Sequence, residues 1–435
     1  MTILPEMYEK QKKILIITAS GGGGLLQAAK AKEQEILAAN EALIIKKDLL
    51  KDLVCKPLGY FGIHSWNNAQ RKGDVRSQNN LFFLQAAAEI LFWPEVFYKI
   101  LRILFKENID KIIDTQPVGL APIIKAIRIY NKIRKKNVIL EKVVVDLPTK
   151  RSTHFFRSVK RLSKKDKKYL KLISLPPMLD EGQTEDEFWM KNCRLKTEDV
   201  SVNEYPIRLG FKKFVNKKRK KEKFNFFVKA NNFVEAQNIE NVLKKGSLGF
   251  NKINNYSFEF EMLPNEFMIT IVLGSNPANV ATINYVKEFI KIAKQTNKKI
   301  NLFVFCLEFK LEKDNLFNSV ISQIINEVKY PKNLTVIPMP FQDDENVASL
   351  FFRSDLTITR SGGQTIVELM SVSKGVNWIH SEAKRKKNKE ISKKELLRGI
   401  PGWEAGNALY FQTKNNSDIV TPEILEGKFG KLFIC

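Results

Sequence analysis

Short runs of apolar, often β-branched residues alternate along this chain with longer stretches whose apolar positions recur at helical spacing. Such runs predict buried strands, and the stretches between them predict amphipathic helices. In the first half the predicted strands are "KILIITAS" (13–20), "ALIIKKDLL" (42–50), the beginning of 109–133 and "EKVVVDLPT" (141–149). In the second half they begin at 267, 300, 334 and 356, with helices predicted over 281–295, 314–328 and 343–352.

Repeated strand–turn–helix units of this length indicate parallel, doubly wound sheets. The chain therefore divides into a domain over 1–213, a basic and polar linker or embellishment over 214–264, and a domain over 265–435. The predicted fold class is α/β, with two Rossmann-like domains facing each other across a cleft. Such sheets bind ligands at the carboxyl ends of their strands, where a Gly cluster at 21–24 and Asp146 both fall.

The apolar stretch 81–105, "LFFLQAAAEILFWPEVFYKILRILF", needs a separate interpretation. Charged residues and Pro94 interrupt it, so it falls short of the roughly 20 apolar residues that span a bilayer. We expect one or two amphipathic helices that face the core. The alternative is an interfacial segment that rests on a membrane, since the stretch is rich in Phe and Trp and is followed by Lys and Arg.

The composition indicates a globular protein from a reducing compartment. The 435 residues are 44% hydrophobic and 10% aromatic, which suffices for two domains with substantial cores. The four Cys residues are scattered without a CxxC pair, and the three His residues have no close Cys or His neighbours. This pattern argues against a disulfide framework and a zinc site. No signal-peptide pattern is visible at the N-terminus, so we expect a cytoplasmic protein, at most peripheral on the inner face of a membrane.

The net charge of +25 indicates either an anionic partner or a strongly solvated surface. Basic residues are concentrated in "NKKRKKEK" (216–223) and "AKRKKNKEISKK" (383–394), which are typical of solvated loops. An anionic membrane surface, an anionic sugar nucleotide and nucleic acid are all compatible with this charge. Nucleic acid is the weakest of the three, because the chain has neither arrayed aromatic–basic motifs nor zinc-finger spacing.

The stretch "TRSGGQTIVEL" (359–369) is the strongest candidate for a binding site. It joins a predicted strand, "SDLTIT", to a helix that is expected to stop at Gly375. A Gly-rich turn in this position directs backbone N–H groups and the positive end of the helix dipole at one point, which suits a phosphate. The same turn also serves as an ordinary connection in α/β proteins, so these eleven residues alone leave both interpretations open.

With its flanks, "SDLTITRSGGQTIVELMSVSKGVNWI" (354–379) resembles the nucleotide-sugar signature of family 28-like glycosyltransferases. These are the enzymes that make monogalactosyldiacylglycerol and the related bacterial lipid II N-acetylglucosaminyltransferases. The segment "IPGWEAGNALYF" (400–411) also resembles a family motif, and the resemblance is strongest over 354–379 and 401–409. Further resemblances are "ITASGGGGLLQAAKA" (17–31), "VVVDLPTKRSTHFF" (143–156), "YPIRLGF" (205–211) and "VLGSNPAN" (272–279). Together they cover most of the chain outside about 155–200, 214–265 and 383–399. The resemblance implies the GT-B fold and an inverting, metal-independent transfer from a UDP-sugar.

In this family the second domain binds the donor. By resemblance, Ser361, Gly362 and Thr365 contact the UDP diphosphate, and Glu368 binds the ribose hydroxyls. A carboxylate suits a vicinal diol, and Glu368 lies on the same helix face as Thr365. Trp403 stands where the family has Gln, and the basic insertion separates the two motifs by more than the family leads us to expect. The donor-binding set is Gly274, Ser275, Arg360, Ser361, Gly362, Gly363, Gln364, Thr365, Glu368, Glu404, Ala405, Gly406 and Asn407.

The first domain is expected to bind the acceptor near its Gly loop (Gly21, Gly22, Gly23 and Gly24). In the family this loop ends in a His that acts as, or supports, the general base, whereas this chain has Gly24 or Leu25 there. An inverting transfer needs a base that deprotonates the acceptor hydroxyl. Asp146 is the first substitute and His154 the second. The structural alternatives are a turn or cap residue for Asp146 and a loop residue packed against aromatic neighbours for His154.

The sequence thus predicts a glycosyltransferase that moves a hexose from a UDP-sugar to an acceptor hydroxyl, with a diacylglycerol-like membrane lipid as the expected acceptor. The alternative is a non-catalytic GT-B-like scaffold that has lost the loop His and keeps the nucleotide pocket. We expect no metal and no cofactor besides the donor substrate, and "DDE" (343–345) is interpreted as a helix N-terminus. The sugar, the acceptor class and the oligomeric state stay open.

Overall fold

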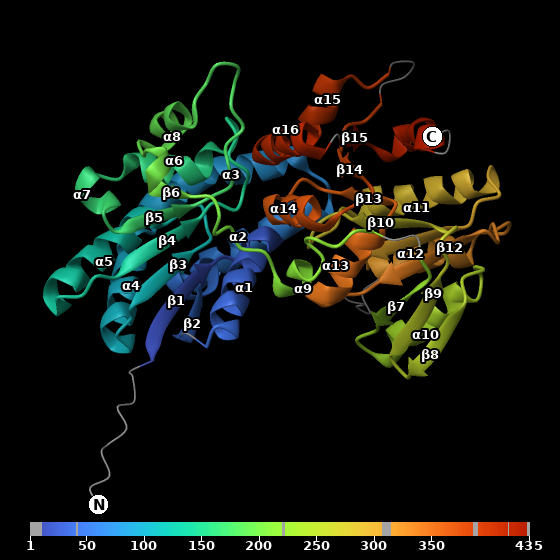
Figure 1. Ribbon diagram of the computed structural model, residues 1–435, viewed down its shortest axis with the longest axis horizontal. Coiled ribbons are helices and arrows are strands. Elements are labelled where there is room, and N and C mark those ends of the chain that lie inside the picture. The colour runs from blue at the N-terminus through green and yellow to red at the C-terminus, as the bar shows by residue number, and fades with distance from the viewer. Residues whose placement is uncertain are drawn as a thin grey trace, which may run out of the picture. The chain divides into compact units, whose positions relative to one another are not determined.

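The computed structural model describes residues 11–40, 42–219, 222–306, 315–385, 390–415 and 417–432. The chain forms two compact units (Figure 1). Each unit is made of two segments that are separate in the sequence. The first unit contains the chain up to Ser65 and Leu81–Arg208, while the second contains Trp66–Asn80 and the chain from Leu209. Each unit has a six-stranded parallel sheet, so the predicted fold class of two doubly wound α/β domains is confirmed.

The sheet of the first unit has the strand order β2-β1-β3-β4-β5-β6 and is parallel throughout. The order reverses between β1 and β3, so the loops after these two strands border the crevice in which such a sheet binds ligands. Apolar runs form the strands because helices cover both faces of a parallel sheet. The strands are β1 (Lys12–Thr18), β2 (Ala42–Asp48), β3 (Lys111–Asp114), β4 (Ile139–Val143), β5 (Leu170–Ile173) and β6 (Val200–Ser201).

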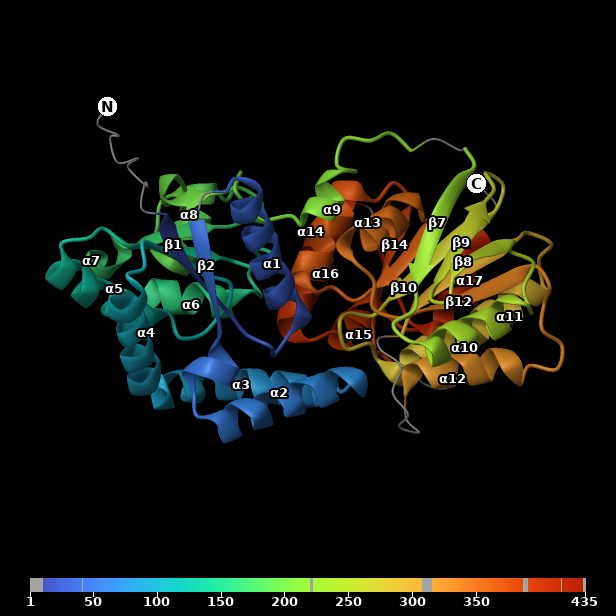
Figure 2. The same ribbon diagram turned by 90° about the horizontal axis from the view of Figure 1, so that it is seen from below.

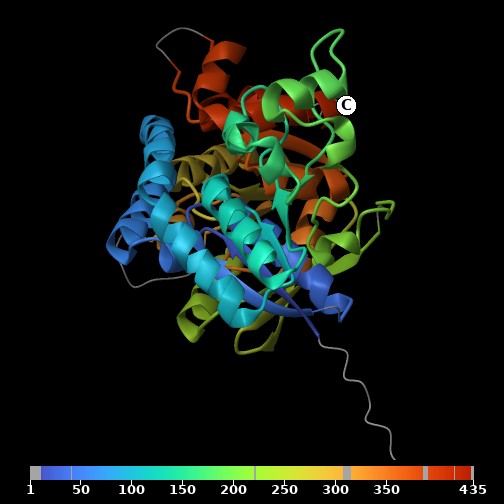
Figure 3. The same ribbon diagram turned by 90° about the vertical axis from the view of Figure 1, so that its left-hand side faces the viewer.

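Helices surround this sheet, and α4 and α5 pack side by side on it (Figure 3). Helices α2 and α3 form a hairpin (Figure 2), whose turn lies in the segment that belongs to the second unit. The helices are α1 (Gly23–Ala38), η1 (Leu49–Leu53), α2 (Lys56–Arg71), α3 (Val75–Leu91), α4 (Trp93–Glu107), α5 (Leu120–Arg134), α6 (Thr153–Arg161), α7 (Lys164–Lys167), α8 (Glu185–Cys193) and η2 (Thr197–Asp199).

The apolar stretch 81–105 falls on α3 and α4, which meet at a sharp bend. Helix α4 faces the core through Val96, Ile100 and Leu104, as expected. Helix α3 does not, because Phe83 is 76% and Ile90 75% exposed, so the prediction of a core-facing helix is wrong there. Among the described residues no single helix is long and apolar enough to cross a membrane, although α3 and α4, bent by 63°, meet that criterion as a pair.

The main sheet of the second unit has the order β12-β11-β10-β13-β14-β15, again parallel. Its order reverses between β10 and β13, which places the second ligand crevice beside the loops that follow these strands. The strands are β10 (Phe267–Val272), β11 (Ile300–Phe305), β12 (Leu334–Met339), β13 (Leu356–Thr359), β14 (Val376–His380) and β15 (Asp418–Val420). The helices are α11 (Asn279–Lys294), α12 (Leu316–Ile325), α13 (Asp344–Arg353), α14 (Gly363–Val372), α15 (Lys393–Arg398), α16 (Gly402–Asn415), η3 (Pro422–Ile424) and α17 (Leu425–Leu432).

The stretch predicted as a linker or embellishment contains a folded module. After α9 (Leu209–Lys212) come β7 (Phe224–Lys229), α10 (Phe233–Leu243), β8 (Phe250–Asn254) and β9 (Ser257–Met262), and the strands form an antiparallel sheet ordered β7-β9-β8 (Figure 1). Alternate residues such as Phe226 and Phe258 join the hydrophobic core of the main sheet. Helix α10 contacts β12 and α12, so the module extends this core. The two basic runs lie only partly within the described residues.

A fully buried ion pair lies under the carboxyl edge of the first sheet. Lys142 Nζ on β4 is 2.6 Å from Asp114 Oδ2 at the end of β3, and neither side chain is exposed. Lys142 also donates to the backbone carbonyl of Gln116. Burial raises the pKa of the Asp114 carboxyl, and the Lys142 ammonium opposes that shift. The pair therefore ties the end of β3 and the loop that follows it to β4.

We predict that Lys142→Met lowers the free energy of unfolding by about 3–5 kcal/mol, because it leaves a carboxyl group buried without its partner. Lys171→Met is the matched control, because Lys171 lies on β5 of the same sheet and makes an exposed ion pair with Glu204. This substitution should change the free energy of unfolding by less than about 1 kcal/mol. Urea unfolding followed by circular dichroism measures both. Equal losses in the two variants would contradict a structural role for the buried pair.

Candidate functional site

The turn after β13 has the geometry that the sequence predicts for an anion site. Gly362 is the N-cap of α14 and contributes no side-chain cap, so the first N–H groups of the helix receive no hydrogen bond from it. A Cβ atom added at Gly362 would meet no heavy atom within 4 Å. The hydroxyl of Ser361 is buried and makes no hydrogen bond within the described part of the chain. The start of α14 thus borders open space at Gly362, with the buried Ser361 hydroxyl in the preceding residue.

The two motifs of the second half, far apart in sequence, meet at this turn. Asn407 on α16 donates from Nδ2 to the carbonyl oxygen of Ser361 at 2.8 Å. Arg360 Nη2 lies 3.4 Å from Glu404 Oε2, and both side chains are about nine-tenths buried. Helix α16 packs against α14, so the long insertion between the motifs does not separate them in space. Ala405 and Gly406 are buried in the same turn of α16.

Glu368 lies inside α14, where its side chain is only 1% exposed. Its Oε1 accepts a hydrogen bond of 3.3 Å from Gln364 Nε2, one helical turn earlier. Thr365 is half-buried on the same helix. The structure therefore places Arg360, Ser361 and Gly362 in the turn before α14, and the other predicted residues of this motif within the first two turns of the helix. The Glu368 carboxylate is buried.

The turn after β10 lies directly beside the turn after β13. Gly274 has a φ of +86°, and a Cβ atom at this position would lie 3.9 Å from Arg360 Cδ. Glycine tolerates this left-handed conformation, and the backbone angle alone is the reason for glycine here, because a Cβ would make only ordinary contact with Arg360. The predicted residues Gly274 and Ser275 thus adjoin Arg360 at the point where the strand order reverses.

In the first unit the Gly loop leads from β1 into α1, whose N-cap Gly22 has a φ of +139° and makes no side-chain cap. Ser20, just before the loop, donates its hydroxyl to the Asp48 carboxylate. Thr115, after β3, donates its hydroxyl to the carbonyl oxygen of Leu25 at 3.1 Å. The loop is therefore tied to the strands on either side of β1. Gly21 lies in this loop, whereas Gly23 and Gly24, which the sequence predicts in it, are the first two residues of α1.

Asp146 and His154, proposed as alternatives, are in contact with each other. His154 Nε2 is 2.9 Å from Asp146 Oδ2, and the two side chains are 11% and 13% exposed. The imidazole ring packs edge-on against Phe82, with the centroids 4.9 Å apart, and also contacts Phe155. Packing thus fixes the ring, and the hydrogen bond orients the carboxylate. Asp146 follows β4, which is two strands from β1 in the sheet, so the pair and the Gly loop lie along the same sheet edge.

Sequence reasoning missed several residues around these sites. It did not single out the buried pair of Asp114 and Lys142, although a Lys at the start of an apolar strand was a visible anomaly. It also missed Gln78, whose Oε1 accepts a 3.0 Å hydrogen bond from Arg360 Nη2. No local pattern marks Gln78, because its partner is 282 residues away.

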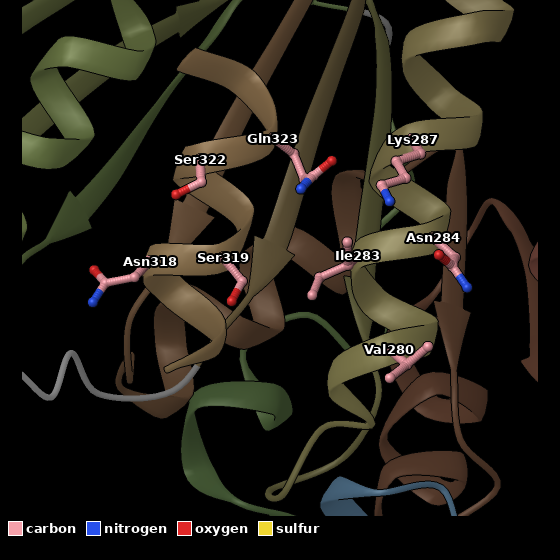
Figure 4. A pocket seen from close by; sticks show the side chains of 8 residues that line it. All are labelled: Val280, Ile283, Asn284, Lys287, Asn318, Ser319, Ser322 and Gln323. Carbon is pink, nitrogen blue, oxygen red and sulfur yellow. The ribbon is translucent and has the colours of Figure 1, made fainter. Parts of the chain in front are cut away.

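A separate polar groove lies between α11 and α12 (Figure 4). It has a volume of about 430 Å³ and contains none of the predicted donor residues. Its lining residues are Val280, Ile283, Asn284, Lys287, Asn318, Ser319, Ser322 and Gln323. Within the described residues, no group of three or more His, Cys, Asp or Glu side chains could hold a metal ion.

Comparison with known proteins finds similarity in solved structures alone. No family model matches the chain. No curated protein matches it either. MurG from Acinetobacter baumannii is 12% identical with a TM-score of 0.44, covering 97% of this chain and 91% of that one. UDP-GlcNAc 2-epimerase from Neisseria meningitidis, bound to UDP-GlcNAc, is 9% identical with a TM-score of 0.40 and coverages of 97% and 99%.

The glycosyltransferase SnogD from Streptomyces nogalater is 11% identical, with a TM-score of 0.40 and coverages of 97% and 100%. Similarities this distant assign no activity to the chain. The chemistry of the site therefore has to be derived from its own residues.

We predict that Gly362→Val weakens UDP binding by about tenfold or more, because the new side chain fills the space over the α14 N-terminus and blocks its backbone donors. The protein has room for this side chain, so the free energy of unfolding should change by less than about 1 kcal/mol. Gly249→Val is the control, because that position in the same unit is equally open. Calorimetry with UDP and thermal unfolding measure the two effects. Unaltered UDP affinity would show that the turn is an ordinary connection.

Proposed function

We propose that this chain is a GT-B glycosyltransferase that transfers a hexose from a UDP-sugar to an acceptor hydroxyl, of the family 28-like type that its motifs resemble. The observation that carries the proposal is the hydrogen bond from Asn407 to the Ser361 carbonyl. It brings the two motifs of the resemblance together at the reversal point of a Rossmann-ordered sheet, which is where nucleotides bind in this fold.

In this proposal the donor's diphosphate lies over Gly362, against the N-terminal N–H groups of α14 and the Ser361 hydroxyl. Glu368 binds the ribose hydroxyls, and Arg360 supplies positive charge beside the diphosphate. As the bond between the anomeric carbon and the diphosphate breaks, negative charge accumulates on the leaving UDP. Fixed backbone dipoles and a guanidinium stabilise that charge without reorganising.

The first unit supplies the base. Asp146 accepts the proton of the acceptor hydroxyl while that oxygen attacks the anomeric carbon, and the attack inverts its configuration. His154 is a positioning residue, because it is packed between aromatic rings and donates to the Asp146 carboxylate. The pair takes the place of the His that the family has in its Gly loop.

We further propose a lipid acceptor of the diacylglycerol type, used at an anionic membrane surface. Helices α2, α3 and α4 expose many large apolar side chains on the first unit: Leu58, Tyr60, Phe61, Phe83, Leu84, Ile90, Leu91 and Tyr98. A pocket of about 400 Å³ in this unit is lined by Ile90, Trp93, Pro94 and Ala121, together with Glu89, Ser158 and Arg161. Apolar side chains next to basic ones suit the interface of an anionic leaflet, as does the net charge of +25.

One observation favours a second candidate, a non-catalytic scaffold that binds UDP-sugars. The Gly loop contains no His, so the family's own base is absent. The scaffold and the transferase share the donor site and differ in whether Asp146 accepts a proton. A measurement of UDP release therefore distinguishes the two functions, whereas a measurement of UDP binding does not.

We predict that the purified chain releases UDP from at least one common UDP-hexose when vesicles contain diacylglycerol and an anionic phospholipid. Asp146→Asn should lower kcat by about 10²–10⁴-fold with UDP affinity unchanged. Asp180→Asn, an exposed carboxylate of the same unit that pairs with Lys150, is the control and should keep full activity. UDP binding without release from any donor would favour the scaffold, and release that needs no diacylglycerol would contradict the lipid acceptor.

A further inference from the structure

The turn of the α2–α3 hairpin belongs to the second unit, although both of its flanks belong to the first. We call this segment, Trp66–Asn80, the strap. Its sequence, "WNNAQRKGDVRSQNN", is rich in Asn and Gln and poor in apolar residues. A surface hairpin with this composition would ordinarily be solvated. Here it packs against the loops that carry the predicted donor residues.

Both ends of the strap contact the start of α16. The indole ring of Trp66 stacks on that of Trp403, with the centroids 5.5 Å apart and an angle of 27° between the planes. At the other end, Asn79 Oδ1 accepts a hydrogen bond of 3.2 Å from the backbone N–H of Gly402. Trp403 is the position where this chain departs from the family motif, and the stack gives that departure a structural reason.

Gln78 connects the strap to Arg360 itself. Its side chain is 1% exposed, and its Nε2 donates to the carbonyl oxygen of Ala69 within the strap at 3.4 Å. Its Oε1 accepts from Arg360 Nη2 at 3.0 Å. Because both the nitrogen and the oxygen of this buried amide have partners, the amide has one orientation. Gln78 therefore holds the Arg360 guanidinium group in place. Glu404 holds the same nitrogen from α16.

The remaining contacts extend to the loops after β10 and β14. Asn276 Nδ2 donates to Asn67 Oδ1 at 3.1 Å and to Gln70 Oε1 at 3.4 Å. Gly73, in the turn, has a φ of +64° and lies against the carboxylate of Glu382, leaving no room for a Cβ atom. The strap therefore contacts the loops after β10, β13 and β14 as well as the start of α16.

We propose that the strap is a positioning element of the donor site, in which Gln78 is a positioning residue that aims Arg360 at the diphosphate. This inference rests on the proposed function, because it presumes that Arg360 faces a UDP-sugar. With one nitrogen held by Gln78 and Glu404, the other N–H groups of the planar guanidinium are directed to one side, which suits bidentate binding of a phosphate. Through the stack on Trp403, the strap also shapes the side of the site where the family motif contacts the sugar.

The test measures UDP and uridine binding to the full chain by calorimetry. Gln78→Met keeps the size of the side chain and removes the acceptor, so UDP affinity should fall by about tenfold while uridine affinity stays unchanged. Arg360→Met should weaken UDP binding at least as much, and the double variant should be no weaker than Arg360→Met alone. Gln295→Met, an exposed Gln of the same unit that contacts Glu426, is the matched control.

Equal losses for UDP and uridine in Gln78→Met, or additive losses in the double variant, would overturn the inference, because they indicate a general structural effect. If Gln78→Met does not fold, Trp66→Ala tests the same strap at a half-buried position, with an expected loss of about threefold for UDP. Wild-type affinity in that variant would also overturn it. A wild-type chain that binds no UDP contradicts the proposed function and this inference together, whereas wild-type binding that Gln78→Met leaves intact contradicts the inference alone.

Discussion

The hydrogen bond between Asn407 and the Ser361 carbonyl ties helix α16 to the turn that opens α14. Everything proposed for the second unit depends on this constraint. It places Glu404 beside Arg360 and leaves open the space over Gly362. Without it, two motifs more than thirty residues apart would be separate helices with ordinary caps. With it, Arg360, Glu404 and the start of α14 are brought together at one turn.

In the first unit, too, buried polar contacts hold the loops at the carboxyl edge of the sheet. A buried ion pair, Asp114 with Lys142, holds the edge of the sheet together, and above it packing fixes His154 against Asp146. A carboxylate oriented by an imidazole is a reasonable base for a hydroxyl group, and it needs no His in the Gly loop. In the proposed mechanism, Asp146 after β4 and His154 on α6 take the place of the missing loop His.

Much of the fold could be predicted from local pattern. The run "LTVIPM" (334–339) coincides with β12, because a strand buried on both faces reads as continuous apolar residues. The exposure of the apolar side chains on α3 could not be predicted in this way. Apolar spacing predicts a helix, but it does not show which part of the protein covers that helix. For the stretch 214–264 the sequence leaves a linker and an embellishment both open, because Asn and Lys dilute its alternating strands, although "FNFFVK" alternates as a strand does. The strap had no local signal at all, because Gln78 and Trp66 acquire their roles from partners more than 280 residues away.

Calorimetric titration of the wild type and of Glu368→Gln with UDP and with 2′-deoxy-UDP tests the central claim, that α14 binds a uridine diphosphate by its ribose and phosphates. The substitution keeps the size of a buried side chain and removes its charge. We predict that the wild type binds UDP more tightly than 2′-deoxy-UDP, and that Glu368→Gln weakens UDP binding by about tenfold and abolishes the preference. Absence of UDP binding in the wild type, or equal binding by both proteins, would contradict the account.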